Sequence, residues 1–316
     1  MIPILQDAIN LARKKKTLPT VLSSKELREA LAVAVRERSI FSARTVHGKY
    51  LGVLHATLIQ LLEGKDANGA PIGIPEARLR LKWALNALQY DPAHGFGLPE
   101  EMDIPPAMPG GLTDLGSRQR LDLILKTQWD VLTNAARRTK ELEPERVAMF
   151  PAWQLVRIET KNVPRGFRRN KGGELIPEPE KGWQARFKTA GATGPGAALL
   201  MAWKVSNVWN ELGSVELFND SLGTNHPPFA FNSGMGWREV PVEEATRILG
   251  APPVNKTRPM DAAKLPPARA SEAGLPPATV ERLKRDLAAV EAKDGVLSMD
   301  DILKRAVKRA KEARPQ

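Results

Sequence analysis

Apolar residues recur three and four positions apart through most of the first 145 residues, the spacing that gives a helix one buried face. The run over residues 27–64 keeps this spacing and predicts a continuous helical stretch. Ser23 and Glu26 stand at capping-box spacing before it, and the glycine at its end suits a helix stop. Gly48 and Gly52 lie inside the run, where they predict a kink or the close approach of a neighbouring helix.

Two further helices are expected in this first region. The segment 74–90 has helical spacing, and Pro75 suits a first turn. Residues 91–112 are rich in proline and glycine and predict a long loop. A third helix is expected to open near residues 113–114 and to end before Pro144.

The pattern changes after Phe150, where tryptophan, glycine and proline become frequent. Apolar and polar residues alternate over 153–159, which predicts a strand, and a second strand is expected within 182–191. Short helices are expected over 206–213 and 242–250, with extended loops and turns over 217–240. This part of the chain predicts a small domain of mixed structure.

Prolines and alanines crowd residues 251–278, which predicts an extended linker. Helical spacing returns after it. The expected organisation is a helical region at 1–145, a Trp-rich α+β domain at 146–250, the linker at 251–278 and basic C-terminal helices at 279–316. The fold class expected for the whole chain is α+β, mainly α.

The 316 residues include no cysteine, and this limits the kinds of functional site that the chain can form. Disulfides, Cys-ligated zinc, iron–sulfur clusters and thiol nucleophiles are excluded together, and a reducing compartment fits. The apolar run at the start is broken by Asp7 and Asn10, so no signal peptide is expected. No run approaches the ~18 apolar residues of a membrane span, so no membrane association is expected.

The charge is strongly positive, with 47 Lys and Arg against 36 Asp and Glu and a net charge of +11. A polyanionic partner is one interpretation, since cations on phosphates gain from counterion release, and a solvated surface is the other. No zinc finger, RRM signature or KH loop is present, so the expected contact is nonspecific binding of double-stranded DNA. The densest runs, and the expected DNA-binding residues, are Arg13, Lys14, Lys15 and Lys16, and Arg165, Arg168, Arg169 and Lys171.

Signals for a cofactor or a metal are weak. The histidines lack carboxylates at metalloprotease spacing and are interpreted as structural or surface residues. The glycine-rich segment 191–196 lacks the Gly-Lys-Ser/Thr ending of a phosphate-binding loop and predicts a flexible loop. Residues 290–301 lack carboxylates at the first ligand positions of a calcium loop. No cofactor, metal or small-molecule substrate is therefore expected.

One order of motifs resembles a known family. A strand segment carrying Arg157 is followed by a Trp-containing turn at Trp209, a Pro-Pro segment at Pro227 and Pro228, and a final segment containing Trp237. This order, after a helical N-terminal region, resembles the bacteriophage Mu F-like minor head proteins, also called the phage head-morphogenesis family. The two cysteines of that family's last strand are missing here, as is the His after its strand Arg. Residues matched by the resemblance, or expected in the domain core or a partner interface, are Trp153, Trp209, Pro227, Pro228, Phe229, Asn232 and Trp237.

The resemblance implies a structural, low-copy protein that lies in the capsid interior or the portal region. It would contact the portal protein or the major capsid protein, and packaged DNA, after assembly in the host cytoplasm. Three alternatives stay open: a head–tail connector or scaffold-like protein, a DNA-binding protein unrelated to phages, and an enzyme of the nuclease or ADP-ribosyltransferase type. The enzyme's candidate residues would be Arg157, Glu159, Arg165, His226 and Arg238.

Overall fold

The computed structural model describes residues 3–18, 20, 23, 27, 39–45, 47–96, 106–231 and 233–252. The fold is mixed α+β and mainly helical, as the sequence predicts. The chain divides into two compact units, and the division falls between Trp129 and Asp130, inside the helix α6 (Arg118–Glu141). Among the described residues, no helix is both long and apolar enough to cross a membrane.

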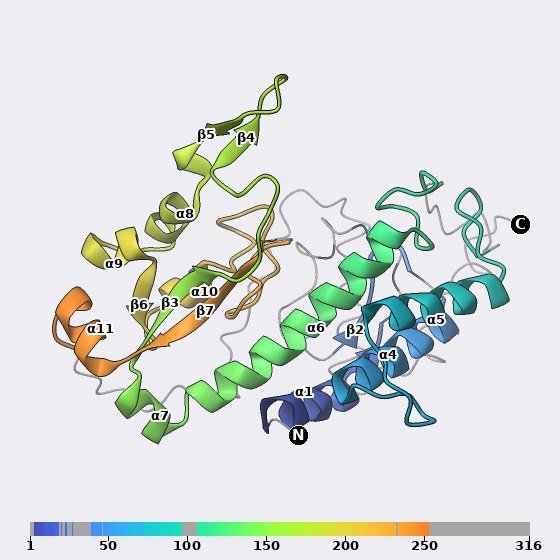
Figure 1. Cartoon of the computed structure of the whole chain (residues 1–316), viewed down its shortest axis with the longest axis horizontal. Helices are drawn as coiled ribbons and strands as arrows, with labels where there is room; N and C mark the ends of the chain where they lie inside the picture. The colour runs from blue at the N-terminus through green and yellow to red at the C-terminus, as the bar shows by residue number, and fades with distance from the viewer. Residues whose placement is uncertain are drawn as a thin grey trace, which may run out of the picture. The chain divides into compact units, whose positions relative to one another are not determined.

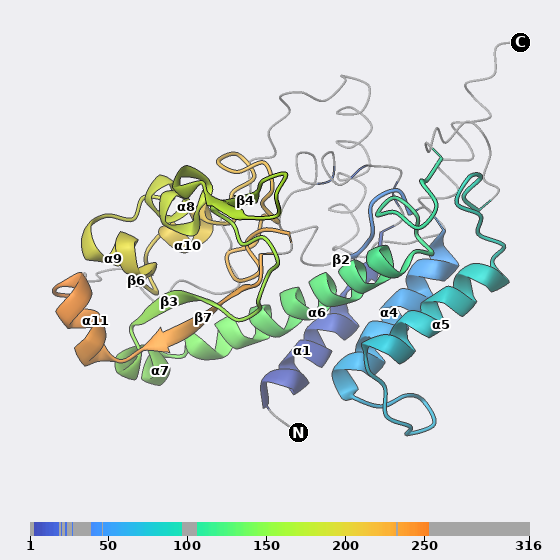
Figure 2. The same ribbon diagram turned by 45° about the horizontal axis from the view of Figure 1, so that its top comes forward.

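The first unit is built mainly of helices. Two-residue strands β1 and β2 pair in parallel beside them. Figures 1 and 2 both show α4 and α5 lying side by side. The elements of this unit are α1 (Pro3–Lys14), β1 (Lys16–Thr17), β2 (Ser39–Ile40), α4 (Gly48–Glu63), α5 (Ile74–Ala87) and the first half of α6.

The core of the first unit is aliphatic, and its residues have the spacing of helix faces. On α4 the buried leucines Leu51, Leu54 and Leu58 are three and four positions apart, so they share one face. Leu81 of α5 and Leu125 of α6 belong to the same cluster and are also buried. Each helix therefore contributes one leucine stripe to a common core.

The long helical stretch predicted from residue 27 is interrupted in the structure. Ser39 and Ile40 form β2, both fully buried, and α4 starts only at Gly48. The imidazole Nδ1 of His47 accepts a hydrogen bond from the Tyr50 N–H and caps the new helix. The prediction of a continuous helix was wrong because isoleucine is compatible with a strand as well as with a helix. The pairing of Ile40 with β1, a tertiary contact, decides for the strand. Residues 28–38 and Glu26 lie outside the described residues.

Other boundaries in the first unit are closer to prediction. Gly64 ends α4 with a left-handed φ of 71°, and α5 spans most of the predicted helix. Gly52 is an ordinary helical position, since no atom lies within 4 Å of where its Cβ would be. Helix α6 begins at Arg118 rather than near 113–114, because the hydroxyl of Ser117 accepts a hydrogen bond from the Arg120 N–H at 3.1 Å.

The second unit centres on a small antiparallel sheet of order β6-β3-β7, with a separate hairpin of β4 and β5. Trp153 of β3 pairs with Ala202 on one side and with Glu239 on the other. After the second half of α6, the elements are α7 (Pro144–Met149), β3 (Ala152–Arg157), β4 (Phe167–Arg169), β5 (Leu175–Pro177), the 3-10 helix η2 (Pro179–Lys181), α8 (Trp183–Thr189), α9 (Gly194–Leu199), β6 (Met201–Trp203), α10 (Val208–Glu211), β7 (Met235–Val240) and α11 (Val242–Leu249).

Several predictions for this unit are confirmed and others are wrong. Strand β3 and the helices α10 and α11 lie where the sequence places a strand and two short helices. Residues 182–191 contain the helix α8 instead of a strand, since Trp183, Arg186 and Phe187 are buried at helical spacing. The segment 217–240, expected as loops and turns, ends in the strand β7, and the glycine-rich segment 191–196 already contains the start of α9. The linker from residue 253 on and the expected C-terminal helices lie outside the described residues.

Candidate functional site

The β4–β5 hairpin is an exposed element of the second unit. Figure 1 shows it standing away from the three-stranded sheet. All three residues of β4 are exposed, including Phe167 at 41%. Phe167 is opposite Pro177 and Arg169 is opposite Leu175, so these side chains share one face, and Arg168 points to the other. The ribbon carries cations and apolar groups together.

The cationic side chains of this hairpin differ in the number of ion pairs and hydrogen bonds that they form. Arg168 forms an ion pair with Glu178 at 3.4 Å, and Arg169 donates to the carbonyl oxygens of Gly173 and Asn162. Lys171 lies in the exposed turn between the strands and has no partner among the described residues. Lys171 is therefore the most available of the predicted DNA-binding cations in this cluster.

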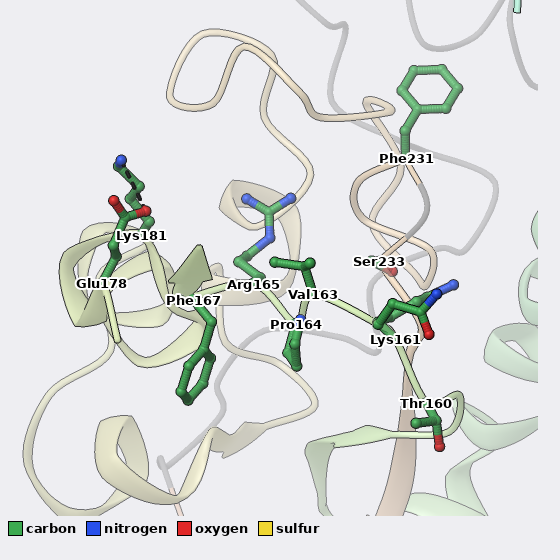
Figure 3. Close-up of a pocket in the computed structure, with 12 residues that line it drawn as sticks. Thr160, Lys161, Val163, Pro164, Arg165, Phe167, Glu178, Lys181, Phe231 and Ser233 are labelled. Carbon is green, nitrogen blue, oxygen red and sulfur yellow. Dashed lines mark hydrogen bonds and ion pairs between the residues drawn. The ribbon is translucent and has the colours of Figure 1, made fainter. Parts of the chain in front are cut away.

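A pocket of about 610 Å³ opens at the base of the hairpin. In Figure 3, Glu178 and Lys181 stand on one side of it and Lys161 and Ser233 on the other, with Arg165 between them. The complete lining is Thr160, Lys161, Asn162, Val163, Pro164, Arg165, Gly166, Phe167, Glu178, Lys181, Phe231 and Ser233. Three cationic side chains and one carboxylate give this lining a net positive charge.

Arg165 joins the pocket to a partly buried ionic group centred on Asp220. Its guanidinium pairs with Asp220, which also accepts a hydrogen bond from Arg186 at 2.7 Å. Both guanidinium groups lie over the Trp183 ring, at 5.0 and 5.4 Å from its centroid. Burial alone would raise the pKa of the Asp220 carboxyl, but the hydrogen bonds from Arg165 and Arg186 outweigh it and hold that pKa below its ordinary value.

The basic run that ends α1 is only partly on the surface. Lys14 and Lys16 are exposed, and Arg13 pairs with Glu63 at 2.6 Å while its side chain stays 55% exposed. Lys15 is 6% exposed, so its ammonium does not face solvent as the DNA-binding interpretation requires. Three of the four predicted cations therefore remain candidates for a DNA contact.

The aromatic residues matched by the family resemblance lie in the core of the second unit. Trp153 and Trp237 stack at 4.1 Å with their planes 3° apart, and Trp209 meets both edge-on. These three side chains and Phe229 are at most 2% exposed. Pro227 and Pro228 are buried and joined by a cis peptide bond. Asn232 lies outside the described residues.

A buried ionic network supports this aromatic core and leaves no clear signal in the sequence. The Lys204 ammonium, with a fully buried side chain, donates to Glu239 Oε1 at 2.7 Å and to the Glu141 carbonyl oxygen. The Trp153 Nε1–H donates to the Glu141 carboxylate at 2.6 Å, and Arg146 holds the other oxygen of Glu239. These residues are far apart along the chain, so only the fold brings them together.

The same network shifts two carboxyl pKa values in opposite directions. Burial raises the pKa of Glu141, although the nearby Arg137 guanidinium opposes it. Burial alone would also raise the pKa of Glu239, but hydrogen bonds from Arg146 and Lys204 outweigh it and hold the pKa below its ordinary value. The network therefore stabilises the charged form of Glu239, whereas burial disfavours the charged form of Glu141.

The five residues of the enzyme alternative are each engaged separately or exposed. Glu159 pairs with Lys161 at 2.9 Å, Arg165 with Asp220, and Arg238 with Glu244 at 2.6 Å. His226 is 2% exposed and its Nδ1 lies 2.8 Å from the carbonyl oxygen of Pro227. Arg157 is exposed at the end of β3. In the described ranges, no cluster of three or more His, Cys, Asp or Glu side chains is arranged to hold a metal ion.

No protein-family model matches this chain, and neither does a curated protein or a solved structure.

Proposed function

We propose that this chain is a structural, low-copy minor head protein of a bacteriophage that contacts the portal protein or the major capsid protein and binds packaged double-stranded DNA nonspecifically. The order of motifs from β3 through Trp209 and the Pro-Pro segment to β7 supports the head-protein part. In this proposal the chain works in the capsid interior or at the portal.

The exposed cations on the β4–β5 hairpin are the observation that carries the DNA contact. Arg168, Arg169 and Lys171 are exposed on an element that stands away from the sheet. A narrow, exposed ribbon of this kind can contact a phosphate backbone without any rearrangement of the core. Nonspecific binding needs only such cations, since counterion release does not depend on base sequence.

The DNA contact is tested by measuring duplex affinity at several salt concentrations. Changing Lys171 and Arg168 to Gln should lower affinity at every sequence and reduce the slope of log K against log salt by about 1 for each phosphate that is no longer neutralised. Lys188 is exposed on α8 in the same unit, so Lys188→Gln is the matched control. An unchanged salt slope in the hairpin variant contradicts the DNA contact.

The head assignment is tested on particles. Quantitative mass spectrometry of density-purified virions and procapsids should find the chain at full length and at low copy relative to the coat. Presence in procapsids alone would indicate the scaffold-like alternative. Absence from all particles would overturn the structural proposal and direct attention to nuclease and transferase assays.

A further inference from the structure

The pocket at the base of the hairpin has features beyond those that a duplex contact needs. Its volume of about 610 Å³ falls within the ~300–1,000 Å³ of pockets that enclose small ligands. A rigid duplex touches a ribbon from outside and has no group that fills such a pocket. The pocket is suited to a single chemical group that projects from its ligand, such as one phosphate or one unpaired base.

The pocket lining offers donors for an anion. The backbone N–H groups of Thr160, Asn162 and Val163 have no partner among the described residues. Lys161 and Lys181 bring ammonium groups to the same pocket, and Thr160 adds a hydroxyl. Amide N–H groups and ammoniums together are the donors that phosphate oxygens accept from.

A glycine leaves room for the Lys161 side chain. Gly234 has a φ of 63°, and a Cβ there would lie 2.6 Å from the Cε of Lys161 and 3.0 Å from the carbonyl oxygen of Glu159. A side chain at 234 would displace the lysine. The chain therefore keeps room for Lys161 beside the loop that leads into β7.

Each of the two lysines has a carboxylate partner, and Lys161 pairs with Glu159 at 2.9 Å. Lys181 pairs with Glu178 at 3.0 Å, but its side chain is 65% exposed. An exposed pair of this kind is worth little, since water and salt screen it. A phosphate can therefore replace Glu178 as the partner of the Lys181 ammonium at a small cost in free energy. Glu178 then still pairs with Arg168 at 3.4 Å.

The lining also contains apolar and aromatic side chains. They are Val163, Pro164, Phe167 and Phe231, and Phe167 is 41% exposed. Phosphate donors beside aromatic side chains are the combination that binds single-stranded nucleic acid, in which an unpaired base stacks while the backbone follows the cations. An acidic peptide uses the cations but gains no stacking from the rings.

We propose that this pocket binds single-stranded nucleic acid, with one backbone phosphate at Lys161 and the loop amides, another phosphate of the same strand at Lys181 on the opposite side, and a base against Phe231. The proposal extends the DNA contact above to an unpaired strand. It concerns a separate set of residues, so it succeeds or fails independently of duplex binding and of the role in the head.

The test measures binding of the full chain to a short labelled oligothymidylate and to a duplex of the same length. Lys181→Gln should weaken strand binding and lower the salt slope by about 0.7, the contribution of one phosphate on a single strand. Phe231→Ala should weaken it roughly tenfold or more, because the base can no longer stack. Neither change should alter duplex affinity. Lys188→Gln and Leu175→Ala, both at exposed positions outside the pocket lining, should leave strand binding unchanged.

Several results would overturn the proposal. They are unchanged strand affinity in the folded Lys181→Gln protein, equal losses on strand and duplex, and displacement of the strand by oligoglutamate of equal charge, which would indicate an acidic peptide. Binding of thymidine monophosphate as tight as that of the strand would indicate a free nucleotide instead. If one of these results were found while duplex binding still depended on Lys171 and Arg168, the strand proposal would fail and the proposed duplex contact would be kept.

Discussion

The two units of this chain are stabilised by different chemistry. The first packs leucines from α4, α5 and α6 into an aliphatic core. The second packs Trp153, Trp209 and Trp237 and closes the core with buried charges, of which Lys204 is the most enclosed. Leucine packing tolerates exchange of similar volumes, whereas stacked rings and buried ion pairs need particular partners. The second unit should therefore be the more sensitive to single substitutions.

The largest effect is expected at the stacked pair. Trp153→Ala removes a fully buried ring that stacks on Trp237 and donates to Glu141, and it should lower the free energy of unfolding of the second unit by about 3–5 kcal/mol. Denaturant unfolding followed by near-UV circular dichroism and by far-UV helix signal checks it. The near-UV signal should be lost first. Equal shifts of both signals would contradict the distinction between the units.

Removal of the buried cation comes next. Lys204→Met leaves Glu239 with Arg146 alone, so a loss of about 3 kcal/mol, the low end for a broken buried pair, is expected. Lys188→Met, at an exposed position of the same unit, should change the free energy of unfolding by less than about 0.5 kcal/mol. Similar effects for the two lysines would show that the buried network is not stabilising.

A close backbone contact gives the third prediction. A Cβ on Gly213 would lie 1.7 Å from the carbonyl oxygen of Thr224, so Gly213→Ala forces the backbone apart and should cost about 1–3 kcal/mol. Thermal unfolding of the purified variant measures it. A variant as stable as the parent would mean that this contact is easily relaxed.

Acid should affect the second unit by a smaller amount, because its groups partly oppose one another. Glu239 and Asp220 have pKa values below their ordinary 4.5 and 3.8, so their contribution is present above those values and is lost as pH falls through the lower folded ones. The raised pKa of Glu141 acts in the opposite direction. Near-UV circular dichroism against pH should show a net loss below pH 4.5. A second unit that gains stability there would contradict the dominance of the paired carboxylates.

The smallest effect is expected in the first unit and has the opposite sign. Gly52 lies inside α4 with open space at its Cβ position, so Gly52→Ala should stabilise the protein by about 0.5–1 kcal/mol through helix propensity. It is the counterpart of Gly213→Ala, with the same chemical change at a position without a neighbouring atom. The helix signal during thermal unfolding should move to higher temperature.

The sequence by itself determined the elements that depend on local pattern. Helical spacing located α5 and α11, Gly64 marked the end of α4, and alternation located β3. It also determined the missing cysteine chemistry and the positive charge. The helices, the helix end and the strand depend on residues close together in the chain, because helix periodicity, capping and strand alternation act within one turn or one strand.

Tertiary structure decided the rest. Ile40 forms a strand because β1 is there to pair with it, and α8 is a helix because Trp183 and Phe187 are buried on one side. The basic runs were visible in the sequence, but the burial of Lys15 was not.

The pocket itself joins residues 160–167 to 178–181 and 231–233, and the ionic network joins Glu141 to Lys204 and Glu239. Contacts between such distant segments depend on how the elements pack, and one sequence contains no local signal for them.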